Sequence, residues 1–294
     1  MAGKKSSASK IKIERFDDLF GMGFEVQKSE NKVMVIPLEQ LHDFTGHPFK
    51  VLDDEKMEET VESIRQYGVL NPALARPRAE GGYELLSGHR RKRGSFLAGL
   101  EEMPVIVREY TDDEAAIIMV DANIQREDIL PSEKAKAYKI KYEAMKYQGK
   151  KGEMSTLDKV GETAGENAKK VQRYLWLSRL SDELLDMVDK KKLGFSQGVD
   201  ISFLSEIEQQ WVQVLLEEKG CNISTVQSGK LKEYGKNGEL TFAMVRLILT
   251  EEKTKTRKIT LKADQISKYF EEGCSSEEIE NIIIRLLDEW KNKQ

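Results

Sequence analysis

The sequence is poor in the residues that cross-link a chain or bind transition metals. It has two cysteines in 294 residues, Cys221 and Cys274, which lie far apart without a Cys-x-x-Cys spacing. This argues against a disulfide framework or a cysteine-rich zinc site, and it agrees with a reducing compartment. The three histidines, His42, His47 and His89, also lack the spacing of metal ligands.

Long apolar runs are absent as well. No run approaches membrane-spanning length, and the first residues, from Met1 to Ser7, lack the apolar core of a signal peptide. We therefore expect a cytoplasmic protein that does not use a membrane. Hydrophobic residues make up 39% and charged residues 33% of the chain, which is typical of a soluble, helix-rich protein with two or three domains.

The charge is unevenly distributed. A net charge of −4 argues against a chain that coats nucleic acid over its whole surface. It does not argue against a local basic face, because nucleic acid responds to the local field. The stretch from Lys134 to Lys151 contains seven lysines and a single acidic residue, Glu143. The middle of the chain is therefore the basic part.

Strand and helix signals alternate in the first part of the chain. We predict a flexible tail over residues 1–30, with a short helix near Phe16–Phe20, and a compact α/β domain over 31–128. Strands are expected at 33–37, within 69–77, at 83–86 and at 103–110. Helices are expected from Asp53 to Gly68, over 90–98 and over 111–120, whereas 38–50 reads as irregular. In the first of these helices Met57, Val61 and Ile64 would pack inward, and Thr111–Glu114 would form a capping box at the start of the last.

The rest of the chain has helical patterns. We predict an all-helical domain over 129–220, in which Ala135, Tyr138, Tyr142 and Met145 form an apolar stripe after Pro131. Residues 221–294 form a mostly helical C-terminal segment with strong helices at 242–250 and 276–291. The apolar face of the last helix is either ordinary core or a seam between two copies of the chain. The expected fold class is α+β.

A strand, a glycine and a basic helix follow one another between Tyr83 and Leu100. Gly88 would let the backbone approach a ligand closely, and the free N–H groups of the following helical turn favour an anion. That turn carries four cations: Arg90, Arg91, Lys92 and Arg93. Arginine forks suit phosphate oxygens. The alternative is a basic helix end that only contacts solvent.

A second polar cluster, Asp121–Asp128, follows the capped helix that starts at Thr111. Asn123 and Arg126 are three residues apart and would share a helix face. The amide oxygen can join a Mg²⁺ shell, and the arginine can reach a phosphate. A polar helix end that makes its own caps is the alternative.

Residues 156–177 have helix-turn-helix spacing. Gly161 would allow the two helices to approach, Gly165 would form the turn, and Asn167 would cap the second helix. The side chains expected to face outward, and to contact bases and phosphates in a major groove, are Asn167, Lys169, Lys170, Gln172 and Arg173. An ordinary helical hairpin is the alternative.

In this order, the three motifs resemble those of the ParB partition-protein family. Gly88-His89-Arg90-Arg91 is similar to the family's Gly-Glu-Arg-Arg motif, and Ala122-Asn123-Ile124-Gln125-Arg126 is similar to its Glu-Asn-x-Gln-Arg motif. The resemblance covers roughly residues 33–216. It implies a small mixed α/β domain of the ParB and sulfiredoxin type, followed by a helix-turn-helix domain.

The resemblance also implies a function. Family members are dimeric DNA-binding proteins that CTP and Mg²⁺ switch into sliding clamps, and they segregate chromosomes, plasmids or mobile elements. They load on a centromere-like site in double-stranded DNA, work with a ParA-type ATPase and associate with the bacterial nucleoid. Asn123 would help to place Mg²⁺. The residues that would surround the nucleotide are Gly68, Val69, Leu70, Asn71, Arg76, Ser87, Gly88, His89, Arg90, Arg91, Asn123 and Arg126.

Two departures from the family motifs bear on chemistry. His89 replaces the Glu of the first motif, and Ala122 replaces the Glu of the second, a residue tied to hydrolysis. Without that carboxylate the obvious group for orienting water or metal is missing. We therefore predict nucleotide binding with slow or absent CTP turnover. Two alternatives stay open: a regulator or nucleoid-occlusion-like protein without a segregation role, and an ATP-dependent phosphotransferase of the sulfiredoxin or serine-kinase type.

Overall fold

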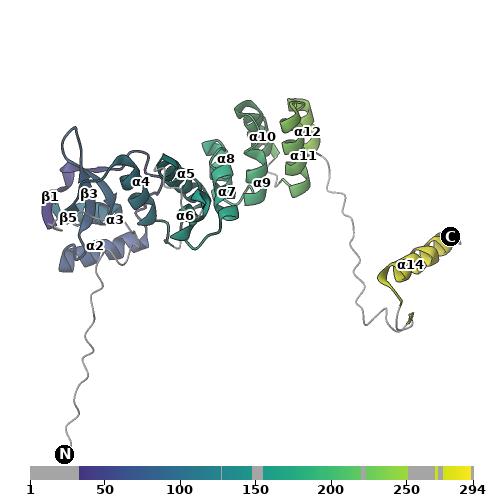
Figure 1. Ribbon diagram of the computed structural model, residues 1–294, viewed down its shortest axis with the longest axis horizontal. Helices are drawn as coiled ribbons and strands as arrows, with labels where there is room; N and C mark the ends of the chain where they lie inside the picture. Colours follow the sequence, from purple (N-terminus) through teal and green to yellow (C-terminus); the bar gives the residue numbers. More distant parts are fainter. Residues whose placement is uncertain are drawn as a thin grey trace, which may run out of the picture. The chain divides into compact units, whose positions relative to one another are not determined.

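A computed structural model describes residues 33–126, 128–147, 155–219, 223–250, 269–270 and 274–292. It shows a five-stranded mixed sheet with its helices, followed by a series of helices, which confirms the α+β class (Figure 1). The chain divides into one unit that ends at Thr250 and a second unit over 251–294, and each is described by itself. The predicted tail and its short helix lie outside the described residues.

The sheet has the order β1 (Val33–Pro37), β5 (Glu102–Val107), β3 (Ala73–Pro77), β4 (Tyr83–Ser87) and β2 (Leu41–Asp43). β1 pairs antiparallel with β5 and β3 antiparallel with β4, while the β5–β3 and β4–β2 pairs are parallel. The four predicted strands are thus confirmed. The prediction of irregular structure over 38–50 was wrong in part, because a 3-10 turn (Leu38–Gln40) and β2 lie there. A three-residue strand leaves no periodic signal, and β2 exists because its backbone pairs with β4.

Two helices lie together beside the sheet. α2 (Glu55–Tyr67) begins at Asp54, whose side chain accepts from the Met57 N–H, and it ends at Gly68 with φ +70°. Its buried face is the predicted one: Met57, Val61 and Ile64. α3 (His89–Leu97) packs against α2 at Gly94, where an added Cβ would lie 3.0 Å from the Ile64 Cδ1. The absence of a side chain at Gly94 therefore lets the two helices approach.

α4 (Asp112–Asp121) is the most buried helix of the sheet domain. Thr111 and Glu114 form the predicted capping box at its start. Every residue from Ala115 to Asp121 is buried, with one side against Leu74 and Leu86 of the sheet and another against α5. α4 thus connects the sheet to the helical part of the chain.

The remaining helices of the first unit pack on one another. They are α5 (Pro131–Tyr147), α6 (Thr156–Glu162), α7 (Ala168–Leu177), α8 (Asp182–Asp189), α9 (Phe195–Ile201), α10 (Glu206–Lys219), α11 (Thr225–Asn237) and α12 (Phe242–Thr250). A helix often packs on the next helix but one, as in the α5–α7, α9–α11 and α10–α12 pairs. One apolar cluster runs from Leu177 to Ile248 and includes Leu231 and Val245, so the packing continues across residue 220, where we predicted a boundary.

The second unit contains α14 (Ser276–Lys291), which confirms the predicted helix. Ser275 and Glu278 form its capping box. Its apolar face is poorly covered: Ile282 and Ile283 are half-buried, and Leu286 and Trp290 are 55% and 60% exposed. None of the helices in the described ranges is long and apolar enough to cross a membrane.

Candidate functional site

Gly88 joins β4 to α3 in a conformation that favours glycine. Its φ is +105°, and a Cβ added there would lie 2.8 Å from the Ala73 Cβ. The left-handed region is costly for other residues, and the approach of β3 leaves no room for a side chain. Gly88 caps α3 without a side-chain hydrogen bond, so no capping side chain occupies the first-turn N–H groups. This geometry favours an anion at the start of α3.

Three cations of α3 pair with carboxylates from the segments around it. Arg90 Nη2 lies 3.0 Å from Asp54 Oδ1, Lys92 Nζ lies 3.0 Å from Asp43 Oδ1, and Arg93 Nη2 lies 2.6 Å from Asp53 Oδ2. The hydrogen bond from Arg90 lowers the pKa of Asp54, and the one from Arg93 lowers the pKa of Asp53. The carboxylates are 42–63% exposed, and such pairs contribute little net stability. A phosphate group can therefore replace them at small cost.

Arg91 is held differently from its neighbours. Its Nη1 donates to the backbone oxygens of Asn71, at 2.6 Å, and Pro72, at 2.7 Å. Burial lowers its pKa. Arg91 and the predicted loop Gly68–Asn71 line the same hollow of about 350 Å³, which lies between α2 and α3. The structure thus brings five predicted site residues together there.

The opposite face of α3 borders a larger cavity. It has a volume of about 1040 Å³, and its lining includes His89, Lys92, Arg93 and Phe96 of α3 together with Leu52. None of the predicted loop 68–71 reaches it. His89 and Arg91 therefore face different hollows on the two sides of one helix.

The ring of His89 lies against the ring of His47 at an interplanar angle of 37°, and no sequence pattern pointed to His47 as a site residue. The ring centroids lie 3.9 Å apart, and the Nε2 atom of each ring is buried without a hydrogen-bond partner in the described part of the chain. Burial, together with the nearby His47, lowers the pKa of His89 to about 3. Burial also lowers the pKa of His47. Both rings are therefore neutral near pH 7, and no sequence spacing relates them.

The Asp121–Asp128 cluster lies near the same histidines. α4 ends at Asp121, so Asn123 and Arg126 lie in the turns that follow rather than on one helix face. Asn123 Nδ2 donates to the Met119 oxygen at 2.8 Å, which leaves its amide oxygen available. The charge of Arg126 acts on His47. Arg126 is therefore the member of the cluster near His47, whereas Asp121 pairs with Lys141 and Asp128 with Lys56.

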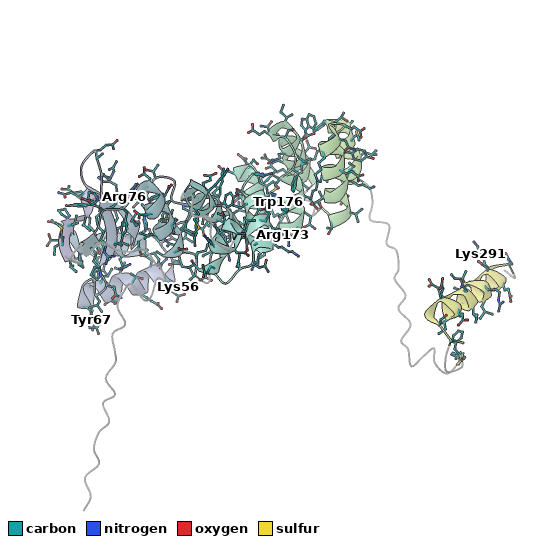
Figure 2. All side chains as sticks on the ribbon, in the orientation of Figure 1. Lys56, Tyr67, Arg76, Arg173, Trp176 and Lys291 are labelled. Atoms are coloured by element: carbon teal, nitrogen blue, oxygen red, sulfur yellow. The ribbon has the colours of Figure 1, made fainter. Side chains whose placement is uncertain are left out.

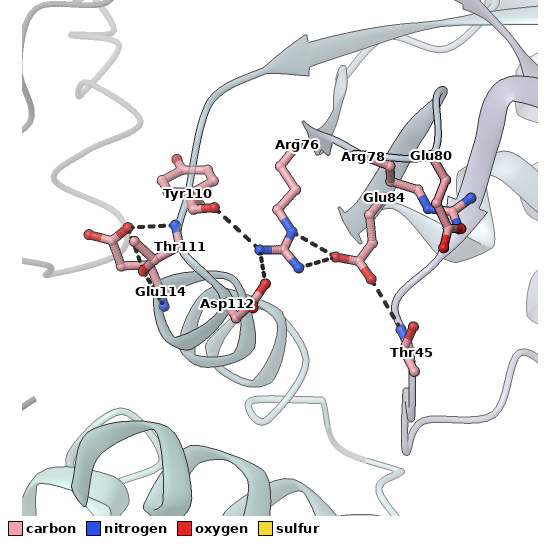
Figure 3. A network of polar contacts seen from close by, with 9 residues as sticks. All are labelled: Thr45, Arg76, Arg78, Glu80, Glu84, Tyr110, Thr111, Asp112 and Glu114. Atoms are coloured by element: carbon pink, nitrogen blue, oxygen red, sulfur yellow. Dashed lines mark hydrogen bonds and ion pairs between the residues drawn. The ribbon is translucent and has the colours of Figure 1, made fainter. Parts of the chain in front are cut away.

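Arg76 does not join this group. It lies three residues beyond Ala73, the neighbour of Gly88, and so roughly 10 Å farther along β3. Figure 3 shows its guanidinium between Glu84, at 2.6 Å, and Asp112, at 2.7 Å, while Glu84 also accepts from the Thr45 N–H. Arg76 therefore ties β3 and β4 to the start of α4.

The α6–α7 pair has the predicted turn. A Cβ at Gly161 would lie 2.1 Å from the Glu166 oxygen, and Gly165 has φ +63°. Asn167 caps α7 by accepting from the Lys170 N–H at 2.9 Å. Glu166, which sequence reasoning missed, binds three side chains and so holds the turn in place: Lys134 at 2.5 Å, Lys170 at 2.8 Å and Tyr138 at 3.0 Å.

The predicted DNA-contacting residues lie on one helix with different exposure. Asn167, Lys169 and Lys170 are exposed, whereas Gln172 and Arg173 are half-buried. Arg173 donates to Ser196 Oγ at 2.7 Å and lies 4.9 Å from the Phe195 ring centroid. Figure 2 labels Arg173 among the side chains of the packed helices. Three of the five side chains are thus presented to solvent, and Arg173 also contacts α9.

The fold thus combines a five-stranded mixed sheet, whose glycine-started helix α3 suits an anion, with packed helices that include the α6–α7 pair and its exposed lysines. Residues 23–124 match the family described as ParB N-terminal domain. The chain is 31% identical over 206 residues to the "Probable chromosome 1-partitioning protein ParB" of Deinococcus radiodurans, covering 70% of this chain and 68% of that protein. It is 30% identical to the "Chromosome-partitioning protein Spo0J" of Thermus thermophilus, covering 71% and 74%.

A solved structure gives a weaker match. The crystal structure of C-terminally truncated ParB from Caulobacter crescentus with the centromeric parS site is 25% identical, covers 68% of this chain and 98% of that one, and has a TM-score of 0.43. From the matches to the domain family and to the two bacterial relatives, the chain belongs to the ParB family.

Proposed function

We propose that this chain is a DNA-binding partition protein that CTP and Mg²⁺ switch into a sliding clamp. The observation that carries the proposal is Gly88, which has φ +105° and starts α3 with Arg90 and Arg91 in the first helical turn. A glycine-started helix with uncapped first-turn N–H groups and nearby arginines suits a polyphosphate.

The residues around α3 divide into two groups by chemistry. Arg90 and Arg126 would reach the phosphates, and Arg90 would leave the exposed Asp54 to do so. The hollow at Gly68–Asn71 has the position and size for part of the base or ribose. The choice of CTP among nucleotides comes from the family resemblance.

Mg²⁺ fits this site only as a companion of the nucleotide. Among the described residues, no group of three or more His, Cys, Asp or Glu side chains could hold a metal. The Asn123 amide oxygen can supply one ligand, and phosphate oxygens and water would supply the others, as Mg²⁺ commonly prefers. Ala122 provides no carboxylate, and Asp121 is paired with Lys141. Because no free carboxylate is available at these two positions, we expect CTP hydrolysis to be slow or absent.

The α6–α7 pair would bind double-stranded DNA. The exposed Lys169 and Lys170 would contact phosphates, and Asn167 and Gln172 carry amide groups that can read base edges in a major groove. Arg173 would exchange its contact with Ser196 for a base or phosphate. A centromere-like site, a ParA-type ATPase partner and association with the nucleoid follow from the partition role.

Dimerisation through α14 is part of the proposal. The exposed apolar face with Leu286 and Trp290 would be covered by the same face of a second copy. Since the first unit ends at Thr250, removal of residues 251–294 leaves the packed helices intact. We expect the full chain to be dimeric and the shortened chain to be monomeric in light scattering. A shortened chain that stays dimeric would place the interface elsewhere.

Calorimetric titration with CTP, ATP and GTP in the presence of Mg²⁺ tests the nucleotide site. We expect selective CTP binding that Arg90→Ala weakens roughly 10- to 150-fold, because a charged hydrogen bond is lost. Arg78→Ala is the control, since Arg78 pairs with the exposed Glu80 in the same domain. Without nucleotide binding, alone or with duplex DNA, the chain would be a DNA-binding protein that lacks the switch. Selective binding of ATP would support the phosphotransferase alternative.

A further inference from the structure

A buried ion pair lies where the sheet domain meets the α6–α7 pair. Lys141 of α5 places its Nζ 2.5 Å from Asp121 Oδ1, at the end of α4, and 3.0 Å from Thr163 Oγ1, at the end of α6. The Lys141 and Asp121 side chains are 2% and 6% exposed. The helices α4, α5 and α6 thus share one buried polar contact.

Such a contact is an unusual way to hold helices together. Removing two charges from water is costly, and an apolar pair of similar volume would often be equally stable or more stable. What an ion pair adds is direction, because the ammonium must point at both acceptors at once. The contact therefore specifies one arrangement of α4, α5 and α6.

A second hydrogen bond reaches Thr163 from the predicted nucleotide-binding segment, residues 121–126. Gln125 Nε2 donates to the Thr163 backbone oxygen at 3.1 Å. Gln125 lies between Asn123 and Arg126, the two residues assigned to Mg²⁺ and phosphate. Both polar ends of Thr163 are thus bound, the hydroxyl by Lys141 and the carbonyl by Gln125.

Thr163 is part of the turn that positions α7. It caps the C-terminal end of α6, two residues before Gly165 and four before Asn167, the N-cap of α7. A shift of the 121–126 segment would therefore act directly on the turn that presents Lys169 and Lys170.

We propose that Lys141 is a positioning residue that couples the nucleotide site to the α6–α7 pair through Asp121 and Thr163. The inference rests on the proposed function, since it needs a nucleotide at Asn123 and Arg126. Binding there favours one arrangement of the 121–126 segment, and the Lys141 contact transfers that preference to the turn. Because linkage is reciprocal, DNA bound to α7 changes the affinity for nucleotide by the same factor.

Hydrogen exchange of the full chain, with and without CTP and Mg²⁺, tests the coupling. We expect CTP to change the exchange rate of amides in residues 163–172 at least about fivefold, a typical size for coupling between sites. In Asp121→Leu/Lys141→Met, which replaces the ion pair by apolar side chains, the change should disappear. CTP affinity in calorimetry should stay at its wild-type value, and the unfolding midpoint should stay at its wild-type value or rise.

A matched pair on the same helix provides the control. Lys136 of α5 lies 2.6 Å from Asp182 of α8, and the two side chains are 45% and 80% exposed, so Lys136→Met/Asp182→Leu should keep the full CTP response. Should the buried double variant fail to fold, Thr163→Val removes the acceptor hydroxyl and should lose the response, whereas Thr163→Ser should retain it.

The outcomes separate the two proposals. Absence of CTP binding to the wild-type chain would overturn the proposed function. CTP binding without any change over residues 163–172, or a change that persists in the buried double variant or in Thr163→Val, would overturn the coupling through Lys141 and leave the nucleotide site in place.

Discussion

The two candidate sites use charged residues in opposite ways. At the start of α3, Arg90, Lys92 and Arg93 pair with carboxylates that are half-exposed. At the α6–α7 turn, Asp121, Lys141 and Glu166 are almost wholly buried and have defined partners. The first arrangement can exchange its partners for a ligand, whereas the second holds a single geometry.

The two sites differ because their charged side chains are exposed to water to different degrees. An exposed ion pair gains little because water solvates both ions well, so replacing one carboxylate by a phosphate costs little. A buried ion has lost its water, and it becomes strongly destabilising when its partner is removed. Burial alone would raise the pKa of Glu166, but the hydrogen bonds from Lys134, Lys170 and Tyr138 lower it below its usual value. The start of α3 is therefore suited to binding a ligand. The buried charges Asp121, Lys141 and Glu166 are suited to transmitting a change of position from one helix to another.

The largest expected effect comes from breaking the buried pair on one side. Lys141→Met leaves the Asp121 carboxylate buried and unpaired, which should lower the free energy of unfolding by about 3–5 kcal/mol. Urea denaturation measures this loss in the free energy of unfolding.

Lys136→Met is the matched control for that variant. It makes the same substitution on the same helix at an exposed pair, and it should change the free energy of unfolding by less than about 1 kcal/mol. Equal losses in the two variants would show that the distinction between buried and exposed pairs does not hold here.

A smaller effect should come from His89, the buried exception in the otherwise exposed α3 site. In the folded protein its pKa is about 3, against 6.5 in the unfolded chain. The unfolded state therefore binds more protons below pH 6.5, and stability falls as pH drops from 6.5 toward 3. At 1.36 kcal/mol per pKa unit, going from pH 7 to pH 5 should cost about 2 kcal/mol.

Comparison with His89→Gln isolates this contribution, because the amide does not titrate. Urea denaturation at pH 7 and pH 5 should show a smaller loss of stability in the variant than in the wild-type chain. Both proteins keep the other charged and titratable groups around this position: His47, Asp43, Lys92, Arg91 and Arg126. If both chains lose the same stability, His89 titrates at its ordinary pKa and is not buried as described.

Local features were predictable because their cause lies within a few residues. The capping box at Thr111, the cap at Asn167 and the glycine turn at Gly88 each depend on neighbours in sequence. The apolar spacing of Met57, Val61 and Ile64 likewise identified the buried face of α2. Spacing over three or four residues was enough in each case.

Contacts between distant segments could not be predicted in this way. Nothing in the local pattern at His47 shows that its ring meets His89, or that Arg76 is engaged by Glu84 and Asp112. The strand at Leu41–Asp43 has too few residues for a period, and it exists only because β4 lies beside it.

The sequence by itself determined the order of elements, the family motifs and the charged residues available at each site. Tertiary structure alone decided which charges are buried. Lys136 and Lys141 lie on one helix and are chemically identical, but one reaches the exposed Asp182 and the other the buried Asp121. The physical reason is that the energy of a charge depends on the solvent around it, and only the packed chain determines where water is excluded.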